Sequence, residues 1–331
     1  MTDMTRNATN QLLHKAKKLK SDEFYTQYCD IERELKYYPD CFRGKVVYCN
    51  CDDPYKSNFF RYFVNNFHSL GLRELISSCY QPFADDIFHA PSHRAGFFCR
   101  WKGEDMEDSI STHIKTVDFQ GDGDFRSKEC VELLRQSDII VTNPPFSLFR
   151  QYVAQLIDYG KQFLIIGNIN ALTYKGVFEL IQSNKAWLGV NFGRGISGFI
   201  VPDDYEAYGT ETTTNSKGEK IIATNSCFWL TNLEHCQRHI NIVLSKKYYG
   251  NENEYPKYDN CNAINVNKTQ NIPKDYNGLM GVPVTFLHKY NPDQFELVRF
   301  RKGEDGKDLC IKGKCPYFRI LIRKRAVTNA L

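Results

Sequence analysis

The residues best suited to chemistry form one short run, Asn143-Pro144-Pro145-Phe146, directly after the apolar stretch 138–142. We predict a strand for that stretch, and ligands of parallel sheets bind at the carboxyl ends of strands. The Asn143 amide oxygen and the Pro144 carbonyl are hydrogen-bond acceptors. The consecutive prolines fix φ and so hold that carbonyl in place. Phe146 adds an aromatic face on which a flat ring can stack.

Two fixed acceptors beside an aromatic face suit alkylation of the exocyclic amino group of a nucleic-acid base. The lone pair of such an amine is delocalised into the ring, and hydrogen bonds to Asn143 and Pro144 would aim it at a methyl donor. A base extruded from a duplex would stack on Phe146. A double proline can also simply end a strand, but the apolar strand before it and the aromatic residue after it favour catalysis. This chemistry requires no metal ion, and we expect none.

Alternating strands and helices are predicted around this run, which indicates an α/β domain with a mainly parallel sheet. We predict strands at 45–51, 75–80, 116–119, 138–142, 162–168 and 186–190. Helices are predicted from Ser21 or Asp22 to near Pro39 and at 58–70, 127–136, 146–159 and 177–183. Residues 82–116 interrupt the alternation and contain a predicted hairpin. After about residue 190 the pattern is irregular, with strand-like pieces at 226–230, 283–287, 297–301 and 317–322. We therefore predict a domain change near 190–205.

Charge, cysteine content and hydropathy limit the possible classes of protein. The net charge is +4, but residues 1–20 and 296–331 together carry +10 and the middle carries −6. Basic ends around an acidic centre fit a polyanionic ligand, although solvated basic tails have the same composition. The twelve cysteines include no Cys-x-x-Cys pair, which argues against a zinc ribbon or a secreted disulfide framework and suits free thiols in a reducing cytosol. No apolar run suits a signal peptide or a membrane span.

The Asn-Pro-Pro-Phe run resembles the (Asp/Asn/Ser)-Pro-Pro-(Tyr/Phe/Trp) signature of amino-group methyltransferases. The rest of the chain resembles the EcoRI-type modification methylases over nearly its whole length. The segments that carry this second resemblance are 20–27 (KSDEFYTQ), 46–54 (VVYCNCDDP), 121–127 (GDGDFRS), 193–199 (GRGISGF) and 281–289 (GVPVTFLHK). Together they are far more specific than the proline run alone.

This resemblance implies a DNA methyltransferase that moves a methyl group from S-adenosylmethionine to N6 of an adenine in duplex DNA, at a GAATTC-type site, with base flipping. It implies protection of that site from a partner restriction endonuclease, without a stable complex, in the bacterial cytosol; a monomer is one option for the oligomeric state, which the sequence leaves open. The implied fold is the S-adenosylmethionine-dependent methyltransferase fold, a mostly parallel, doubly wound seven-stranded sheet, with an irregular C-terminal target-recognition region. We expect a basic arm at 1–20, the core at 21–200 and the recognition region at 201–331.

The resemblance also implies which residues bind the cofactor. Tyr25 and Thr26 would contact its methionine part, and Asp52 or Asp53, at the end of the first core strand, would pair with its ammonium group. The family's usual Phe-x-Gly-x-Gly pattern is replaced there by a loop without glycine. The remaining candidates for cofactor binding are in segment 121–127. They are Asp122, between the two glycines, and Asp124 and Phe125, which follow the second glycine.

Asp124 and Phe125 resemble the acidic-aromatic pair that holds the cofactor's adenine in related enzymes, and Asp118-Phe119 is the alternative. A calcium loop in segment 121–127 would need more acidic ligands and a distal glutamate. A dinucleotide-binding loop would need a third glycine and a strand directly before it.

The region after 190 mixes basic, aromatic and polar residues, a composition that suits contacts to phosphates and bases. Arg194 lies between two glycines, and His235, Arg238 and His239 form a polar cluster after a predicted strand. Each set can equally be an ordinary solvated turn. Near the end of the chain Arg323, Lys324 and Arg325 are candidates for phosphate contacts or simply a basic tail.

Three other interpretations remain open. Asn-Pro-Pro-Phe also occurs in methyltransferases that act on protein glutamine or RNA bases, although those usually lack a long basic region after the core. A non-catalytic DNA-binding protein could use the same fold, but Asn143 and both prolines are retained. A hydride-transfer enzyme is the least favoured, because the dinucleotide-binding pattern is missing.

Overall fold

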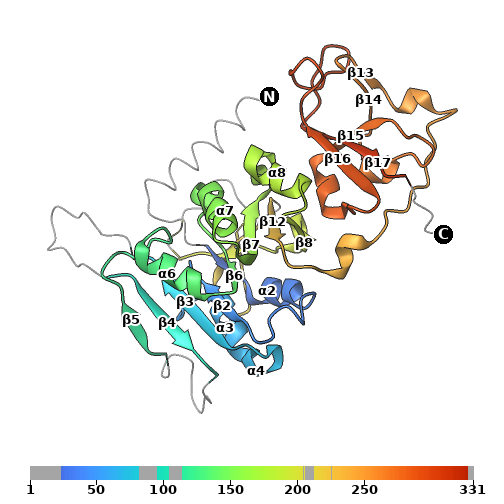
Figure 1. Ribbon diagram of the computed structural model, residues 1–331. Helices are drawn as coiled ribbons and strands as arrows, with labels where there is room; N and C mark the ends of the chain where they lie inside the picture. Colours follow the sequence, from blue (N-terminus) through green and yellow to red (C-terminus); the bar gives the residue numbers. More distant parts are fainter. Residues whose placement is uncertain are drawn as a thin grey trace, which may run out of the picture. The chain divides into compact units, whose positions relative to one another are not determined.

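The computed structural model describes residues 24–81, 95–103, 114–203, 205, 212–224 and 226–326 (Figure 1). The predicted basic arm at 1–20 lies outside the described residues. The chain divides into two compact units: unit 1 comprises 1–171 and 191–233, and unit 2 comprises 172–190 and 234–331. The chain leaves unit 1 after residue 171, re-enters it at residue 191, at the start of the predicted 190–205 range, and leaves it again after residue 233.

The central sheet has the strand order β5-β4-β3-β2-β6-β7-β12-β8. These strands are β2 (Val46–Cys49), β3 (Glu74–Cys79), β4 (Phe97–Trp101), β5 (Thr116–Asp118), β6 (Ile139–Thr142), β7 (Gln162–Asn168), β8 (Trp187–Phe192) and β12 (Cys227–Thr231). In its centre, β3, β2, β6 and β7 are parallel. β4 is antiparallel to both β3 and β5, and β12 is antiparallel to β7.

Two features of this sheet correct the sequence prediction. We predicted seven strands, but the described residues form eight, and β4, β5 and β12 are antiparallel to the neighbours with which they pair. The reason is that the chain adds β4, from the predicted excursion at 82–116, and pairs it antiparallel with both β3 and β5, the strand predicted at 116–119. β8 carries the chain from unit 2 back into unit 1.

Figure 1 shows α6 and α7 on one side of the central sheet and α2, α3 and α4 on the other. The helices of unit 1 are α2 (Tyr28–Leu35), α3 (Asn58–Asn65), α4 (Phe67–Leu70), α6 (Lys128–Gln136) and α7 (Phe149–Asp158), with 3-10 turns η1 (Phe146–Leu148), η2 (from Ile169) and η3 (Gly193–Gly195). The Ser57 hydroxyl caps α3, and the Ser127 hydroxyl caps α6. Gly71, at φ 64°, ends α4.

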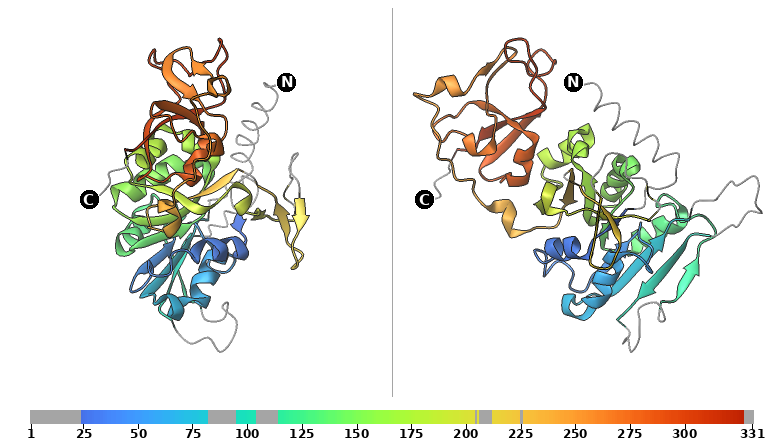
Figure 2. Two further views of the ribbon diagram at one scale, coloured as in Figure 1. Left: turned by 90° about the vertical axis from the view of Figure 1, so that its right-hand side faces the viewer. Right: turned by 180° about the vertical axis from the view of Figure 1, so that it is seen from behind.

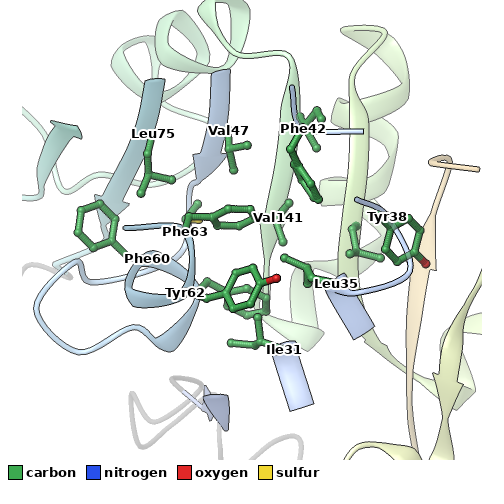
Figure 3. Packing of buried hydrophobic residues seen from close by; sticks show 14 of the residues in the cluster. Ile31, Leu35, Tyr38, Phe42, Val47, Phe60, Tyr62, Phe63, Leu75 and Val141 are labelled. Carbon is green, nitrogen blue, oxygen red and sulfur yellow. The ribbon is translucent and has the colours of Figure 1, made fainter. Parts of the chain in front are cut away.

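The core of unit 1 lies between α2, α3 and one face of the central sheet (Figure 3). Side chains alternate between the two faces of a strand, so Val47 and Val141 reach this layer while their neighbours point to the other face. The labelled side chains in this layer come from both helices, from three strands and from the loop after α2: Ile31, Leu35, Tyr38, Phe42, Val47, Phe60, Tyr62, Phe63, Leu75 and Val141.

A second, small antiparallel sheet in unit 1 has the order β1-β9-β11-β10. It consists of β1 (Tyr25–Thr26), β9 (Phe199–Ile200), β10 (Thr212–Thr214) and β11 (Lys220–Ile222). In the left view of Figure 2 the yellow hairpin of β10 and β11 stands away from the central sheet. The predicted helix start at residue 21 or 22 is wrong, since Tyr25 and Thr26 form a strand that pairs with β9 and α2 begins at Tyr28.

Unit 2 contains a five-stranded sheet with the order β13-β14-β15-β17-β16. Its elements are α8 (Lys175–Gln182), η4 (Cys236–His239), η5 (Glu252–Glu254), β13 (Lys257–Tyr258), β14 (Cys261–Asn265), η6 (Thr269–Asn271), β15 (Leu279–Pro283), η7 (Val284–Lys289), β16 (Phe295–Phe300) and β17 (Arg319–Lys324). The predicted strand at 283–287 is wrong, since β15 ends at Pro283 and η7 buries Val284, Phe286 and Leu287.

The prediction of twelve free thiols is also wrong. Cys310 and Cys315 form a disulfide, because a tight turn between them brings their Cα atoms to 4.2 Å. None of the helices in the described part of the chain is long and apolar enough to cross a membrane. The same residues contain no group of three or more His, Cys, Asp or Glu side chains placed to hold a metal ion.

Candidate active site

Asn143 follows the last residue of β6 and is fixed by the chain segment before β1. Its side-chain Nδ2 donates a hydrogen bond of 2.8 Å to the main-chain carbonyl of Phe24. A carbonyl can only accept, so this contact defines which end of the amide is the nitrogen. The Asn143 Oδ1 is buried and has no hydrogen-bond partner among the described residues. The structure thus presents an oriented, unused acceptor where the sequence predicted one.

The two prolines turn the chain from β6 into η1. The Pro145 carbonyl accepts from the Leu148 amide at 3.0 Å and so begins that 3-10 turn. No described residue donates a hydrogen bond to the Pro144 carbonyl. Phe146, the first residue of η1, is partly exposed, and its ring centroid lies 6.5 Å from that of Phe24.

Phe199 is a member of this aromatic group that the sequence analysis did not single out. Its ring centroid lies 6.0 Å from that of Phe146, in an edge-on arrangement, and 5.8 Å from that of Phe24. Phe199 is the last residue of segment 193–199, so its place in a segment that carries the resemblance was the available signal. Three aromatic rings, from β9, from η1 and from Phe24 directly before β1, therefore pack together beside Asn143.

Asp52, at the end of β2, holds the loop together. Its Oδ1 accepts from the Ser57 hydroxyl at 2.7 Å, and its Oδ2 accepts from the Thr142 hydroxyl at 2.5 Å. This carboxylate connects the carboxyl ends of β2 and β6 with the start of α3, although only 5% of the residue is exposed. The neighbouring Asp53 accepts from the Tyr55 amide, and its carboxylate lies 4.0 Å from the Lys56 ammonium group.

β1 reaches the same edge of the sheet through two contacts. Thr26 pairs with Phe199 of β9, and the Thr26 carbonyl accepts from the Asn58 side chain at 2.8 Å. The Thr26 hydroxyl and the Asn50 Nδ2 are buried without a hydrogen-bond partner in the described part of the chain. Buried polar atoms are normally paired, so such atoms are where a polar ligand can bind.

These unpaired atoms belong to one neighbourhood. Asn143 contacts Phe24, which is two residues before Thr26. Asn50 is two residues before Asp52, which in turn bonds Thr142, the residue before Asn143. The sequence analysis missed Asn50, whose Oδ1 accepts a hydrogen bond from the Tyr152 hydroxyl. An asparagine after a strand carries no sequence signal that distinguishes this role.

The loop at 121–126 lies against the end of β3. A Cβ at Gly123, whose φ is +80°, would come within 2.6 Å of the Cys79 carbonyl, so this close approach requires glycine. The Asp122 Oδ1 accepts from the Asp124 amide at 3.0 Å. The Arg126 guanidinium binds the Asp124 carboxylate at 2.7 and 2.8 Å and lowers the pKa of that carboxyl.

The aromatic residues predicted to hold an adenine are buried. Phe125 is 4% exposed and packs edge-on against Tyr152, with ring centroids 5.1 Å apart. In the alternative pair, Phe119 is 5% exposed and stacks on Phe98, while Asp118 is exposed on β5. Tyr80, directly after β3, is 41% exposed, and its pKa is raised by partial burial and by the nearby negative charges of Asp122 and Asp124. The exposed ring at this place is therefore Tyr80, and the sequence analysis missed it.

Comparisons with known proteins identify the family. The family model described as "Adenine-specific methyltransferase EcoRI" matches residues 12–325. The chain belongs to this EcoRI methylase family. It is 61% identical over 322 residues to "Type II methyltransferase M.EcoRI" of Escherichia coli, covering 97% of this chain and 99% of the relative. The chain is accordingly an adenine DNA methyltransferase of a restriction-modification system, as the sequence analysis predicted.

Two further relatives are similar over nearly their whole length. "Type II methyltransferase M.MpnI" of Mycoplasma pneumoniae is 36% identical over 330 residues, covering 94% of this chain and 98% of the relative. "Type II methyltransferase M.MgeORF184P" of Mycoplasma genitalium is 37% identical over 337 residues, covering 95% and 99%. No solved structure matches the chain.

In this EcoRI-type methylase the candidate DNA-contacting Arg194 lies in η3, within unit 1. The Asp30 Oδ2 of α2 accepts from both the amide and the hydroxyl of Ser197, at 2.8 and 2.7 Å, and Glu34 accepts from the Asn191 amide at 2.8 Å. Burial raises the pKa of Asp30, although its hydrogen bonds oppose this. Two carboxylates that the sequence analysis missed therefore fix the backbone around Arg194.

The predicted polar cluster at 235–239 is not a solvated turn throughout. His235 is buried, its Nε2 lies 3.0 Å from the Leu188 carbonyl, and burial lowers its pKa. The Arg238 guanidinium lies 3.7 Å from the centre of the Trp187 ring, with 9% of its side chain exposed. Both side chains are thus packed against unit 2, which leaves little of either exposed for a DNA contact. His239 is half exposed and lies 2.7 Å from the Asp293 carboxylate.

The basic residues at the end of the chain have partners within unit 2. Arg323 lies 3.9 Å from the Glu296 carboxylate, and both side chains are about half exposed. The Lys324 ammonium group donates to the Lys274 carbonyl, and burial lowers its pKa. Arg325 donates to the Pro292 carbonyl at 2.7 Å. Exposed ion pairs of this kind are weak, so Arg323 can still exchange its partner for a phosphate.

Proposed function

We propose that this methyltransferase transfers the methyl group of S-adenosylmethionine to N6 of an adenine in a GAATTC-type site of duplex DNA. The observation that carries the proposal is the buried, oriented and unpaired Oδ1 of Asn143 beside the partly exposed ring of Phe146. The name M.EcoRI of the relative with 61% identity supports the target site. Methylation of the site would protect it from a cognate restriction endonuclease, without a stable complex between the two proteins.

The chain's own residues would activate the amine by hydrogen bonding. The Asn143 Oδ1 and the Pro144 carbonyl accept from the two N–H bonds, which draws the nitrogen lone pair out of conjugation with the ring. Phe146 stacks on the extruded base and keeps the amino group in that position. When bound, S-adenosylmethionine supplies a methyl group on a positively charged sulfur. After methylation the amino nitrogen would carry one extra proton, which would pass to solvent.

The cofactor's amino acid part would bind at the carboxyl ends of β2 and β6. The Thr26 hydroxyl and the Asn50 Nδ2 fit a carboxylate, because both atoms are buried and lack a partner in the described part of the chain. Tyr25 would contact the same part of the cofactor. Asp53 would pair with the ammonium group, while Asp52 holds the loop in place.

The nucleoside part would lie at the end of β3. Tyr80 offers the exposed ring, and Asp122 keeps one carboxylate oxygen for hydroxyl or amino groups, since only its Oδ1 receives a hydrogen bond in the described structure. Asp124 and Phe125 would act beneath this surface, by holding the loop through Arg126 and Tyr152.

The methyltransferase fold would place target recognition in the region after residue 200. Arg194 would approach the DNA backbone next to the active site, and His239, Arg323 and Lys324 would contribute contacts from unit 2. The arm at 1–20 would add phosphate contacts, and one chain would suffice for the reaction.

Sequencing of genomic DNA for modified bases tests the proposal. Cells that express the chain should carry N6-methyladenine in GAATTC sites, and their DNA should resist an endonuclease that cuts GAATTC. The Asn143→Ala variant serves as the control and should leave the sites unmodified. Modification of cytosine, or of adenine in an unrelated sequence, would refute the proposed base or the proposed site respectively.

A further inference from the structure

The hairpin of β10 and β11 is rooted directly in the active site. β11 pairs with β9, and β9 also pairs with β1. Phe199 of β9 packs against Phe146. Next to the turn of the hairpin, Lys220 pairs with Thr214, and its ammonium group donates to the carbonyls of Asp203 and Tyr205 at 3.1 and 2.7 Å. Gly198 approaches the hairpin so closely that a Cβ there would lie 2.3 Å from the Ile222 carbonyl.

The turn of the hairpin is preformed. The Asn215 Oδ1 accepts from the amides of Lys217 and Glu219, at 2.9 and 3.0 Å, and its Nδ2 donates to the Glu219 carboxylate. Gly218 has a φ of +81°, and a Cβ there would meet no atom within 4 Å. A rigid loop loses little conformational entropy when it binds a partner.

The outer part of the hairpin is exposed and polar. Thr212, Thr213 and Thr214 are all exposed, as are Ser216 and Lys217. Among the described residues Lys217 forms no ion pair. The ammonium group of Lys220 is turned back to the protein, so Lys217 is the cation that the tip presents. Hydroxyl groups with one cation can contact phosphates and base edges.

We propose that this hairpin is a DNA-contacting ribbon, which places Lys217 on a phosphate next to the extruded adenine and the threonine hydroxyls along the adjoining groove. The inference rests on duplex DNA as the substrate. A two-stranded antiparallel ribbon fits the major groove of B-DNA, and the pairing with β9 keeps it at a fixed offset from Phe146. A second copy of the chain is the competing partner, because β10 is an edge strand. Three exposed threonines offer little of the apolar area that a stable dimer needs.

The salt dependence of DNA affinity tests the contact with a matched control. A fluorescent duplex that contains GAATTC is titrated with the full chain between 50 and 200 mM salt. Each phosphate contact adds about 0.9 to the slope of log affinity against log salt, so K217A should lower the slope by about 1 and the affinity roughly eightfold at 0.1 M salt. The control K36A removes one exposed positive charge at the end of α2, before the loop that leads to the start of β2. It should change neither the salt slope nor the affinity.

Photo-crosslinking identifies the partner directly. Benzoylphenylalanine at Ser216 should crosslink to nucleotides that flank the target adenine, whereas the same group at exposed Asp40 should not. An unchanged salt slope in K217A, or a crosslink from position 216 to a second protein chain, would overturn the proposal. Wild-type chain that still methylates GAATTC in the same experiment shows that only the hairpin assignment has failed. Wild-type chain that leaves GAATTC unmodified would instead refute the proposed function.

Discussion

Replacement of Asn143 by aspartate separates the two roles of the Asn143 side chain. Aspartate keeps an oxygen where Oδ1 accepts from the substrate, but it replaces the nitrogen that donates to the Phe24 carbonyl with a second acceptor. Loss of that bond leaves the Phe24 carbonyl without its hydrogen-bond donor, which costs about 1–3 kcal/mol. If the loop shifts to relieve this cost, the rate of methyl transfer falls by roughly 5- to 150-fold, since about 1.36 kcal/mol corresponds to a factor of ten.

Alanine at the same position removes both roles. Deletion of one aligned hydrogen-bonding group of this kind lowers the rate by about 10²–10³-fold, so we expect the order wild type, then N143D, then N143A. A protonated aspartate can donate to the Phe24 carbonyl as the amide did. N143D should therefore recover activity relative to wild type as the pH falls, because burial favours the neutral carboxyl.

Single-turnover transfer of labelled methyl groups, with enzyme in excess over a GAATTC duplex, measures the chemical step. Anisotropy with the same duplex measures binding, which should remain within a fewfold of wild type in both variants. A rate for N143A within tenfold of wild type would refute the acceptor role of Asn143. A rate for N143D equal to wild type at every pH would show that the Phe24 contact does not orient the side chain.

Three further predictions follow from the site and its surroundings. In Phe146→Ala, 2-aminopurine at the target position should be brighter than with wild type, and catalysis should weaken more than binding, because base stacking on an aromatic ring is worth about 1–3 kcal/mol; emission at the duplex level in both proteins would exclude base extrusion. Arg126→Ala should raise the pKa of Asp124 and lower the free energy of unfolding at neutral pH. The difference in unfolding free energy from wild type should vanish as the pH falls through the lowered pKa that Asp124 has in wild type. Equal urea midpoints for the two proteins at pH 7 would contradict this. Arg238→Ala should lower the unfolding free energy by about 1–2 kcal/mol through loss of its contact with Trp187 and leave DNA affinity unchanged; a weaker affinity with unchanged stability would restore it as a DNA contact.

Local signals explain the parts of the fold that the sequence predicted well. The strand predicted at 162–168 coincides with β7, and the helix predicted at 127–136 begins one residue later because Ser127 caps it. Ser57 caps α3 in the same way, and α3 begins at the predicted residue 58. In each case a short polar residue or an apolar run determines the element without help from distant parts of the chain. The position of the Asn143 loop follows in the same way from the apolar strand before it.

The surroundings of that loop depend on contacts between distant residues. Asp30 bonds Ser197, which is 167 positions away, and Asn143 bonds Phe24 across 119 positions. No periodicity or composition reveals such pairs. The burial of Phe125 and His235 was missed for a related reason, since an aromatic or polar residue beside a turn has the same local sequence whether it faces solvent or a neighbouring element.

The pairing of β1 with β9 links the candidate cofactor residue Thr26 to the aromatic cluster around Phe146 and to the exposed hairpin. Thr26, a candidate cofactor residue, lies opposite Phe199, which packs on Phe146. The next strand after β9 is β11, which leads into the exposed hairpin. Two hydrogen-bonded strand pairs thus lie between the hairpin and Thr26, and Asp30 and Glu34 hold the backbone that precedes β9 through Ser197 and Asn191. One small sheet would thus supply a cofactor contact through Thr26, support for the base-stacking Phe146 through Phe199, and the exposed hairpin through β11.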